Sequence, residues 1–311
     1  MSRSAPMLVI CGPTAAGKSA LAFALAKRLS GEIVSADSVQ LYRGLDIGSA
    51  KPSRDELASI AHHLIDVADP TGPFWDAQRW ADQADSIISD IVRRGNFPIV
   101  CGGTGLYIRA LLNGLNAMPP VPDAVKTEVR ADMARRGAPA MHAELARVDP
   151  ASANRLDPND SQRIGRALEV FRASGRPLSL WQTGIDPAPH PRYPAARVAG
   201  LWPSREELQQ RIASRVSKML DSGWVWEVSA LVAAGVPTQQ GPLTALGYRQ
   251  VVQHLAGELP AHQLAEAIGR AHRRYAKRQL TWFRGIAARE HDLRHLDAVE
   301  IEALAEELAS R

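Results

Sequence analysis

Short runs of apolar and β-branched residues recur along the chain, and longer stretches with a helical repeat separate them. The runs lie at residues 7–11, 32–36, 63–67, 98–101 and 197–202. Their length and composition are typical of buried strands, which alternate here with helices. This alternation predicts an α/β fold in which helices flank a parallel sheet.

Three helices around the predicted sheet have clear sequence signals. Residues 20–29 are apolar almost all round, as in a buried helix, and residues 75–94 end in basic side chains before a glycine. A third helix is expected to begin at Ser204, because Ser204 and Glu207 fit a capping box. The face that this helix buries should consist of Leu208, Ile212, Val216 and Met219.

The pattern changes after Gly114, and a proline-rich linker at residues 118–122 leads into a region without strand-like runs. The helical stretches of this region lie at residues 123–136, 139–147 and 160–174. Four prolines within residues 187–194 close it. We therefore expect the first part of an α/β core at 1–118, an all-helical insertion domain at 119–196, and the mostly helical remainder of the core at 197–311.

Composition narrows the class of protein. Hydrophobic residues make up 45% and charged residues 23% of the 311 positions, as in ordinary globular domains, and the net charge of +4 is weak evidence for a polyanionic partner. Cys11 and Cys101 are too few for a disulfide framework or a four-ligand zinc site. We expect a cytoplasmic monomer with no membrane span, no signal peptide and no obligate protein partner.

A phosphate-binding motif follows the first predicted strand. Its residues are Gly12, Pro13, Thr14, Ala15, Ala16, Gly17, Lys18 and Ser19, which satisfy the pattern G-x-x-x-x-G-K-[ST]. The glycines allow backbone N–H groups to turn toward phosphate oxygens, and the following helix adds a positive N-terminus. Lys18 supplies a full positive charge, and the Ser19 hydroxyl can ligate Mg²⁺. The motif predicts an enzyme with a P-loop fold that acts on a phosphorylated compound.

The motif alone does not identify that compound, since kinases, GTPases, ATPases and transferases share it. The chain has no Asn-Lys pair, which excludes the base-reading motif of a guanine-nucleotide switch. Asp66 follows an apolar run, so it is either a helper in Mg²⁺ binding or an ordinary carboxylate at a strand end. A small-molecule or nucleotide kinase and a noncatalytic RNA-binding ATPase module remain the alternatives.

Two further segments are expected beside the phosphate loop. Asp37 follows the second predicted strand, and a glycine-rich turn that contains Thr104 follows the fourth. Both should lie at the carboxyl edge of the sheet, where open α/β sheets bind ligands. There Asp37 is either a general base or the cap of the next helix.

A basic segment lies near the C-terminus. Residues 269–289 contain no acidic residue, and Tyr275 and Trp282 are interleaved among their positive charges. The basic residues are Arg270, Arg273, Arg274, Lys277, Arg278, Arg284 and Arg289. This pattern favours contact with an RNA backbone, and the alternative is a basic helix face packed by its aromatics.

Taken together, these residues resemble the tRNA dimethylallyltransferases, also called tRNA isopentenyltransferases. The similarity extends over nearly the whole chain. It rests on residues 12–19, 37–42, 46–52, 63–66, 102–107, 159–170, 247–249 and 276–282. The resemblance implies Mg²⁺-dependent transfer of a dimethylallyl group from its diphosphate to N6 of the adenosine 3′ of the anticodon, position 37. The tRNAs concerned read codons that begin with uridine.

The resemblance also assigns roles to particular residues. It implies Asp37 as the base that accepts the N6 proton and Thr104 as an orienting hydroxyl. Arg211 and Arg215, four residues apart on one helical face, are expected to join the loop in binding diphosphate, and the alternative is a solvated basic stripe. The residues that the resemblance and the basic segment place against tRNA are Asp37, Ser38, Val39, Gln40, Thr104, Lys126, Gln162, Arg163, Ile164, Gly165, Arg166, Thr244, Ala245, Leu246, Gly247, Tyr248, Arg249, Arg274 and Lys277.

The chain departs from the family pattern at a few positions. Ala16 stands in the phosphate loop where serine is usual, and we expect a small effect because the backbone binds most of the phosphate. Trp224 and Trp226 replace a more usual leucine and glutamate on a predicted helix. The zinc-finger tail of eukaryotic members has no counterpart, so the resemblance implies no metal other than Mg²⁺.

Overall fold

The computed structural model describes residues 6–182, 192–284, 291–293 and 298–309. It contains two compact units, one formed by Met1–Asn113 with Ala188–Arg311 and the other by Gly114–Pro187. In the part of the chain that the structure describes, no helix combines the length and the apolar character needed to cross a membrane.

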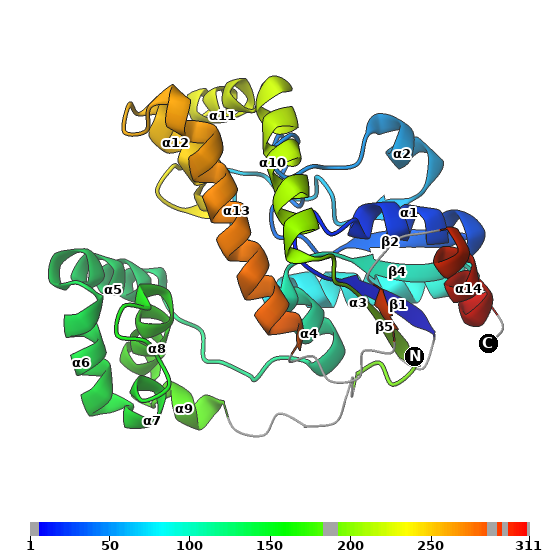
Figure 1. Ribbon diagram of the computed structural model, residues 1–311. Coiled ribbons are helices and arrows are strands. Elements are labelled where there is room, and N and C mark those ends of the chain that lie inside the picture. The colour runs from blue at the N-terminus through cyan, green and yellow to red at the C-terminus, as the bar shows by residue number, and fades with distance from the viewer. Residues whose placement is uncertain (1–5, 183–191, 285–290, 294–297, 310–311) are drawn as a thin grey trace. The chain divides into compact units, whose positions relative to one another are not determined.

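A six-stranded sheet forms the centre of the first unit (Figure 1). Its strands are β1 (Met7–Cys11), β2 (Gly31–Ser35), β3 (His62–His63), β4 (Phe97–Cys101), β5 (Ala196–Leu201) and β6 (His291–Leu293). They lie in the order β3-β2-β4-β1-β5-β6, and every pairing is parallel. The predicted α/β class is therefore confirmed.

Helices cover both faces of this sheet. The helices of the first unit, of which α10 to α13 lie beyond the sheet (Figure 1), are α1 (Lys18–Arg28), α2 (Arg54–Ser59), α3 (Ala77–Arg93), α4 (Gly105–Asn113), α10 (Arg205–Asp221), α11 (Trp224–Ala233), α12 (Tyr248–Leu255), α13 (Ala261–Arg284) and α14 (Ala298–Ala309), with a 3-10 turn at Gly241–Thr244. Alternate residues of a strand point to opposite faces, so Leu8 and Ile10 pack in one hydrophobic cluster with α1 and α14. On the other face, Trp80 of α3 stacks on Tyr107 of α4 with ring centroids 4.8 Å apart.

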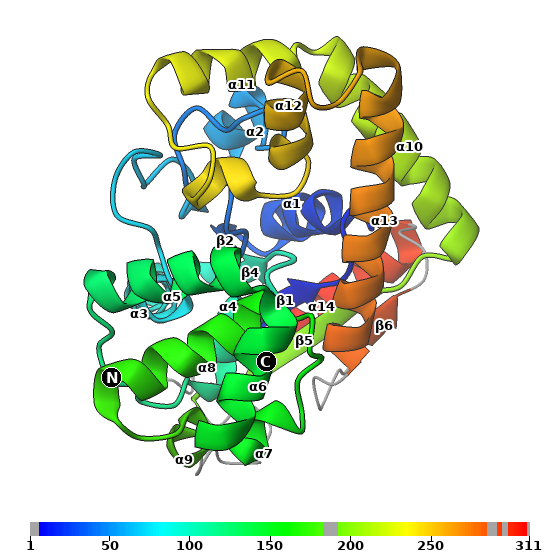
Figure 2. The same cartoon turned by 90° about the vertical axis from the view of Figure 1, so that its left-hand side faces the viewer.

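The helix predicted from the capping box is confirmed. The hydroxyl of Ser204 accepts the Glu207 N–H, the Glu207 carboxylate accepts the Ser204 N–H, and the four expected apolar residues of α10 are buried. In both cartoon views α10 lies side by side with α13 (Figures 1 and 2). These two helices bring cationic side chains to the region beyond the sheet.

The strand predicted at residues 63–67 is largely wrong. Only His62 and His63 pair with β2, and the chain then leaves the sheet because Leu64 and Asp66 adopt left-handed backbone angles, with φ of 60° and 57°. Leu64 is nevertheless buried, whereas Val67 is exposed, so only part of the apolar run reaches the core. The predictions for β1, β2, β4 and β5 agree with the structure to within one residue at each end, whereas no apolar run predicted the short β6.

In the described residues of the second unit, all regular secondary structure is helical (Figure 2). Its helices are α5 (Asp123–Arg136), α6 (Ala138–Val148), α7 (Pro150–Ala153), α8 (Ser161–Ser174) and α9 (Leu178–Trp181). They enclose their own apolar core around Val129, Leu145 and Leu168. Arg172 joins α8 to α6 through Glu144 at 2.8 Å. Most of the predicted closing segment, residues 187–194, lies outside the described residues.

Candidate active site

Three loops that carry the predicted chemistry leave neighbouring strands at one edge of the sheet. The phosphate loop follows β1, Asp37 follows β2, and the second glycine-rich turn follows β4. Because β2, β4 and β1 are adjacent and parallel, these loops emerge side by side at their carboxyl ends. The expected strand–loop–helix context of the phosphate motif is confirmed, since β1 ends at Cys11 and α1 begins at Lys18.

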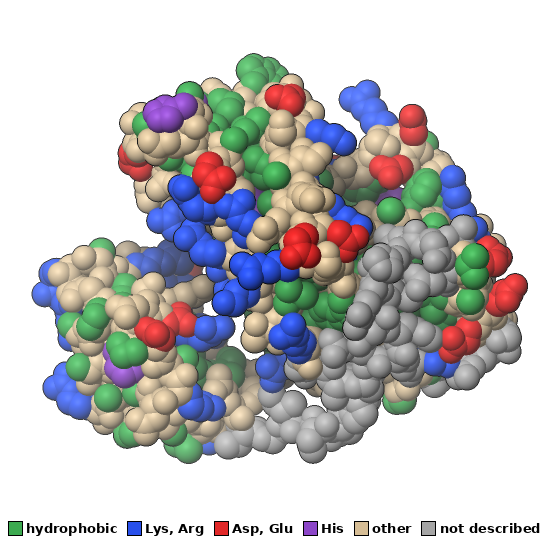
Figure 3. Space-filling model, in the orientation of Figure 1, with side chains coloured by type: hydrophobic (Ala, Val, Ile, Leu, Met, Phe, Trp, Pro, Cys, Tyr) green, Lys and Arg blue, Asp and Glu red, His purple; other side chains and the backbone are tan. Residues whose placement is uncertain are grey.

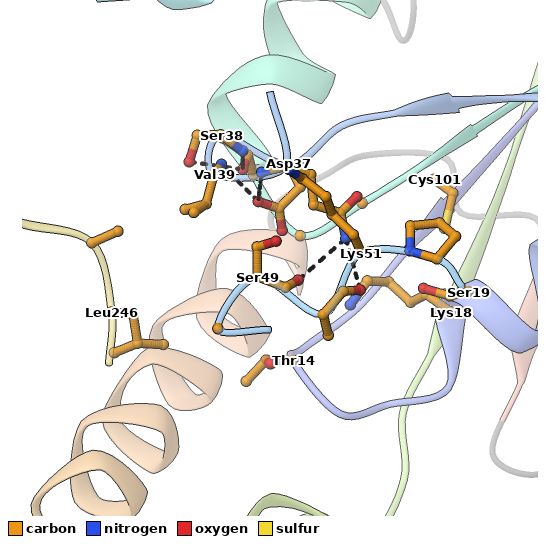
Figure 4. A pocket seen from close by; sticks show the side chains of 18 of the residues that line it. Thr14, Lys18, Ser19, Asp37, Ser38, Val39, Ser49, Lys51, Cys101 and Leu246 are labelled. Carbon is orange, nitrogen blue, oxygen red and sulfur yellow. Dashed lines mark hydrogen bonds between the residues drawn. The ribbon is translucent and has the colours of Figure 1, made fainter. Parts of the chain in front are cut away.

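The loops surround a cavity of about 480 Å³. Predicted site residues that line it are Thr14, Lys18, Ser19, Asp37, Thr104 and Arg215. Figure 4 shows Asp37 and Lys18 projecting toward the same space, with Thr14 and Ser19 on the side of the phosphate loop. A leaving group in the loop and an acceptor beside Asp37 would therefore occupy one cavity.

Partly buried cations make one part of this cavity suited to an anion. Burial lowers the pKa of Lys18 and of Arg215 below their usual values, because the protein does not fully replace the water that a charge requires. Lys18 Nζ donates to the Pro13 carbonyl at 2.7 Å, and within the described residues Arg215 Nε has no hydrogen-bond partner. A bound phosphate group would compensate both charges.

His272 of α13 lines the same part of the cavity without adding charge. Its Nδ1 lies 3.0 Å from the Ile268 carbonyl, so Nδ1 carries the proton in the neutral ring. Burial, with the nearby charge of Arg215, lowers the pKa of His272 to about 4. The imidazole is therefore neutral near pH 7.

Asp37 keeps one carboxylate oxygen available for chemistry. Its Oδ1 accepts the Val39 N–H at 2.8 Å and the Gln40 N–H at 3.3 Å, which closes a tight turn directly after β2. Among the described residues no group donates a hydrogen bond to Oδ2. The turn thus orients the carboxylate with one oxygen and leaves the other to face a substrate.

Thr104 is hydrogen-bonded to the segment that carries Asp37. Its Oγ1 accepts the Ser38 N–H at 3.1 Å, and its own N–H donates to the Ala36 carbonyl at 3.1 Å. The hydroxyl hydrogen stays available to a ligand or to Ser38 Oγ, 3.5 Å away. The structure thus brings together the two side chains that sequence analysis assigned to catalysis.

Helix α13 packs directly on the turn that contains Thr104. A Cβ atom on Gly103 would lie 2.4 Å from Gln279 Nε2, and one on Gly105 would lie 2.2 Å from the Trp282 indole. Only glycine permits this approach. Gln279 Oε1 accepts the Thr14 N–H at 2.8 Å, so that amide of the phosphate loop is engaged by α13. Gln279 lies in one of the stretches that resemble the family, but no local sequence signal indicates its role.

Glu227 is a second residue of the site region that sequence analysis missed. This buried carboxylate of α11 accepts the backbone N–H groups of Asp46 and Ile47, at 2.8 and 2.6 Å, and the hydroxyl of Tyr248 at 2.9 Å. It thereby holds the segment whose Ser49 carbonyl accepts the Gln40 side chain at 3.2 Å. Within an otherwise apolar helix, a single glutamate gives no sequence signal for such a role.

Most of the other predicted residues line the cavity, contact the phosphate loop or are exposed. Ser38, Val39, Gln40, Ala245, Leu246 and Tyr248 line the cavity, although Tyr248 itself is buried. Arg211 donates to the Ala16 carbonyl at 3.2 Å. Thr244, Arg249, Arg274 and Lys277 are exposed, and Figure 3 shows the basic side chains that gather over α13. Arg289 lies outside the described residues.

The predicted tRNA contacts of the second unit belong to α5 and α8. Gln162, Arg163 and Arg166 are exposed on α8, whereas Ile164 and Gly165 are buried and face the core of the unit. Lys126 pairs with Asp123 at 2.9 Å. The exposed three can reach a ligand, but the buried pair can act only through the shape of the helix.

The residues of the cavity fit Mg²⁺ held mainly by substrate and water. In the described ranges no group of three or more His, Cys, Asp or Glu side chains could hold a metal ion. The exposed Ser19 hydroxyl and the Asp37 carboxylate nevertheless line the cavity with hard oxygen donors. Mg²⁺ commonly binds through one or two such groups together with phosphate oxygens. Asp66 is a weaker candidate, because its carboxylate pairs with Lys51.

The comparison with known proteins agrees with the geometry of the site. A sequence profile described as IPP transferase matches residues 40–286. The tRNA dimethylallyltransferase of Sorangium cellulosum is 48% identical over 89% of this chain and 87% of its own. The tRNA dimethylallyltransferase 1 of Trichlorobacter lovleyi is 49% identical over 89% of this chain and 90% of its own.

Two solved structures are similar over most of this chain. The tRNA isopentenylpyrophosphate transferase of Bacillus halodurans is 34% identical, with a TM-score of 0.69 over 98% of this chain and 96% of that one. A eukaryotic dimethylallyltransferase caught acting on tRNA is 27% identical, with a TM-score of 0.71 over 90% of this chain and 70% of that one.

Proposed function

Because the chain belongs to the IPP transferase family of tRNA dimethylallyltransferases, we propose that it prenylates one adenosine of tRNA in the cavity beside Asp37. The donor is dimethylallyl diphosphate and the acceptor is N6 of the adenosine 3′ of the anticodon, position 37, in tRNAs that read codons beginning with uridine. The observation that carries this proposal is the single cavity that holds an anion-binding loop and a free carboxylate oxygen.

The diphosphate lies in the phosphate loop in this proposal. Lys18 and Arg215 stabilise the negative charge that develops as the C–O bond breaks, and their low hydration strengthens the interaction. Ser19 would hold Mg²⁺, which when bound neutralises part of the charge of the leaving diphosphate. Arg211 reinforces the loop through its hydrogen bond to the Ala16 carbonyl.

The acceptor amine needs help because its lone pair is delocalised into the adenine ring. N6 attacks C1 of the allyl group, the C1–O bond breaks, and the diphosphate leaves with the bonding electrons. The free Oδ2 of Asp37 accepts the proton that N6 loses, and the Thr104 hydroxyl orients the amine from the adjacent turn. N6-isopentenyladenosine and diphosphate are the products.

The adenosine must leave the stacked anticodon loop to reach this cavity, as bases do in other enzymes that modify them. The exposed cations of α13 suit the phosphates around the extruded base. We also assign the enzyme to the cytoplasm. In support, Cys11 and Cys101 lie buried on the adjacent strands β1 and β4 and form no disulfide.

Parallel incubations with two labelled donors test the proposal. Dimethylallyl diphosphate labelled in the allyl group should transfer label to tRNA, whereas ATP labelled in the γ-phosphate should transfer none. The P-loop kinase alternative predicts the reverse. Label moving from ATP to any acceptor, with none from the prenyl donor, would refute the proposed reaction.

The α13 surface provides a separate prediction. Replacing Arg274 and Lys277 together by glutamine should weaken tRNA binding and flatten its salt dependence. The slope of log K against log salt should fall by about 0.7 to 0.9 for each RNA phosphate that the variant no longer neutralises. Filter binding at several salt concentrations measures this slope.

A matched control is the pair Lys27→Gln and Arg93→Gln. These residues end α1 and α3, which lead into the starts of β2 and β4 at the opposite edge of the sheet. The control removes the same charge and should leave the slope unchanged. Equal slopes for both double variants would contradict RNA binding by α13.

A further inference from the structure

Helix α13 presents different chemistry on two faces. Its exposed face carries the cations Arg274, Lys277 and Arg278, and its inner face places Tyr275 and Gln279 in the lining of the catalytic cavity. Tyr275 and Gln279 are four residues apart and therefore lie one above the other on the helix. The inner face meets both loops on which the proposed reaction depends.

Gln279 joins these two loops through a single side chain. Its Oε1 accepts the Thr14 N–H of the phosphate loop at 2.8 Å, and its Nε2 donates to the Gly103 carbonyl of the second turn at 2.8 Å. The residue is 5% exposed, and Gly103 leaves room for it to approach the backbone. A buried side-chain amide has few alternative positions when its oxygen and one of its N–H groups are both hydrogen-bonded.

The two hydrogen bonds of Gln279 connect the loop that binds the leaving diphosphate with the turn beside the general base. Thr14 belongs to the loop that holds the leaving diphosphate, and Gly103 directly precedes Thr104, which is bonded to the segment of the general base. Displacement at C1 requires the attacking nitrogen at about 3 to 3.5 Å and aligned with the breaking bond. The relative position of the two loops therefore sets the alignment.

We infer that Gln279 is a positioning residue that holds the phosphate loop and the Thr104 turn in register, so that N6 rather than water captures the allyl group. This inference rests on the proposed function. The competing reaction is complete without another reagent: water attacks C1, the C1–O bond breaks, diphosphate leaves, and the proton passes to Asp37 or solvent. Its products are a dimethylallyl alcohol and diphosphate.

The amide is the one feature of glutamine that this role requires. Gln279→Met has nearly the same length but makes neither hydrogen bond. Gln279→Glu can still accept from Thr14 but cannot donate to Gly103 while ionised. Gln279→Asn keeps both groups on a side chain one methylene shorter, which cannot reach both loops without a backbone shift. All three variants should weaken the alignment of the phosphate loop with the Thr104 turn.

The test compares diphosphate released with allyl label transferred to tRNA in the same reaction. Wild type should release about one diphosphate for each label transferred. In Gln279→Met, transfer should fall roughly 10- to 100-fold, and the ratio of diphosphate to label should rise well above one. Gln279→Asn should show the same rise, which keeps the test available if the methionine variant does not fold.

Gln263→Met is the matched control, because Gln263 is exposed near the start of the same helix. It should keep the wild-type ratio. A folded Gln279→Met or Gln279→Asn variant with the wild-type ratio would overturn the inference, even if its rate were low, since lost stability alone does not divert the allyl group to water. A wild-type protein that transfers no label would instead refute the proposed function.

Discussion

Replacing Asp37 by asparagine should abolish most turnover while leaving tRNA binding intact. Asparagine can still accept the N–H groups of Val39 and Gln40 through its carbonyl oxygen, so the turn after β2 should keep its shape. Its amide cannot accept the N6 proton, because it has no basic oxygen to replace Oδ2. We expect kcat to fall roughly 10²- to 10⁴-fold, the usual contribution of a general base.

Single-turnover transfer and equilibrium tRNA binding should be measured on the same preparation. Asp69→Asn is the matched control, because Asp69 closes a similar turn by accepting the Thr71 N–H at 2.9 Å and is exposed away from the cavity. It should behave as wild type. Turnover of Asp37→Asn close to that of Asp69→Asn would remove Asp37 from the role of base.

Lys18→Ala should weaken binding of dimethylallyl diphosphate without destabilising the protein. A hydrogen bond to a charged group is worth about 1.5 to 3 kcal/mol, so Kd should rise roughly 10- to 150-fold. Burial already disfavours the charged form of Lys18, as its lowered pKa indicates, and removing that charge relieves a desolvation cost in the free protein. The midpoint of thermal unfolding should therefore stay the same or rise.

Calorimetric titration of the donor in the presence of Mg²⁺ checks the first part, and a thermal melt checks the second. Lys27→Ala removes a lysine from the other end of the same helix and serves as the control. If Lys18→Ala bound the prenyl donor as tightly as Lys27→Ala, the phosphate loop would not be the diphosphate site. The loop would then need another ligand.

Local sequence signals predicted most elements of the fold and the class of its sheet. The capping box at Ser204 located the start of α10, and the alternation of apolar runs with helices predicted the parallel sheet. The prediction of a strand at residues 63–67 was wrong because burial alone does not make a strand. Leu64 is buried at a backbone angle that no strand adopts. The left-handed angle at Leu64 leaves no trace in residue type, and the one at Asp66 leaves only a weak trace, because aspartate adopts such angles more often than most residues.

Residues of the candidate site could be predicted where a sequence motif identifies the residue and the preceding strand fixes its position in the sheet. Asp37, Thr104 and Lys18 line one cavity because the strands before them are neighbours in a parallel sheet. The bridge from Gln279 to Thr14 joins residues 265 positions apart. Glu227 likewise reaches backbone groups about 180 positions earlier. Such contacts depend on how α11 and α13 pack, and this packing cannot be inferred from a local sequence pattern.

Allyl-labelled dimethylallyl diphosphate offered to a matched pair of tRNAs tests the central claim most directly. The two unmodified tRNAs should differ only in having adenosine or guanosine 3′ of the anticodon, with Mg²⁺ present in both reactions. The proposed function predicts label on the adenosine tRNA alone. Label on both tRNAs, or on neither while the protein is folded and binds tRNA, would contradict it.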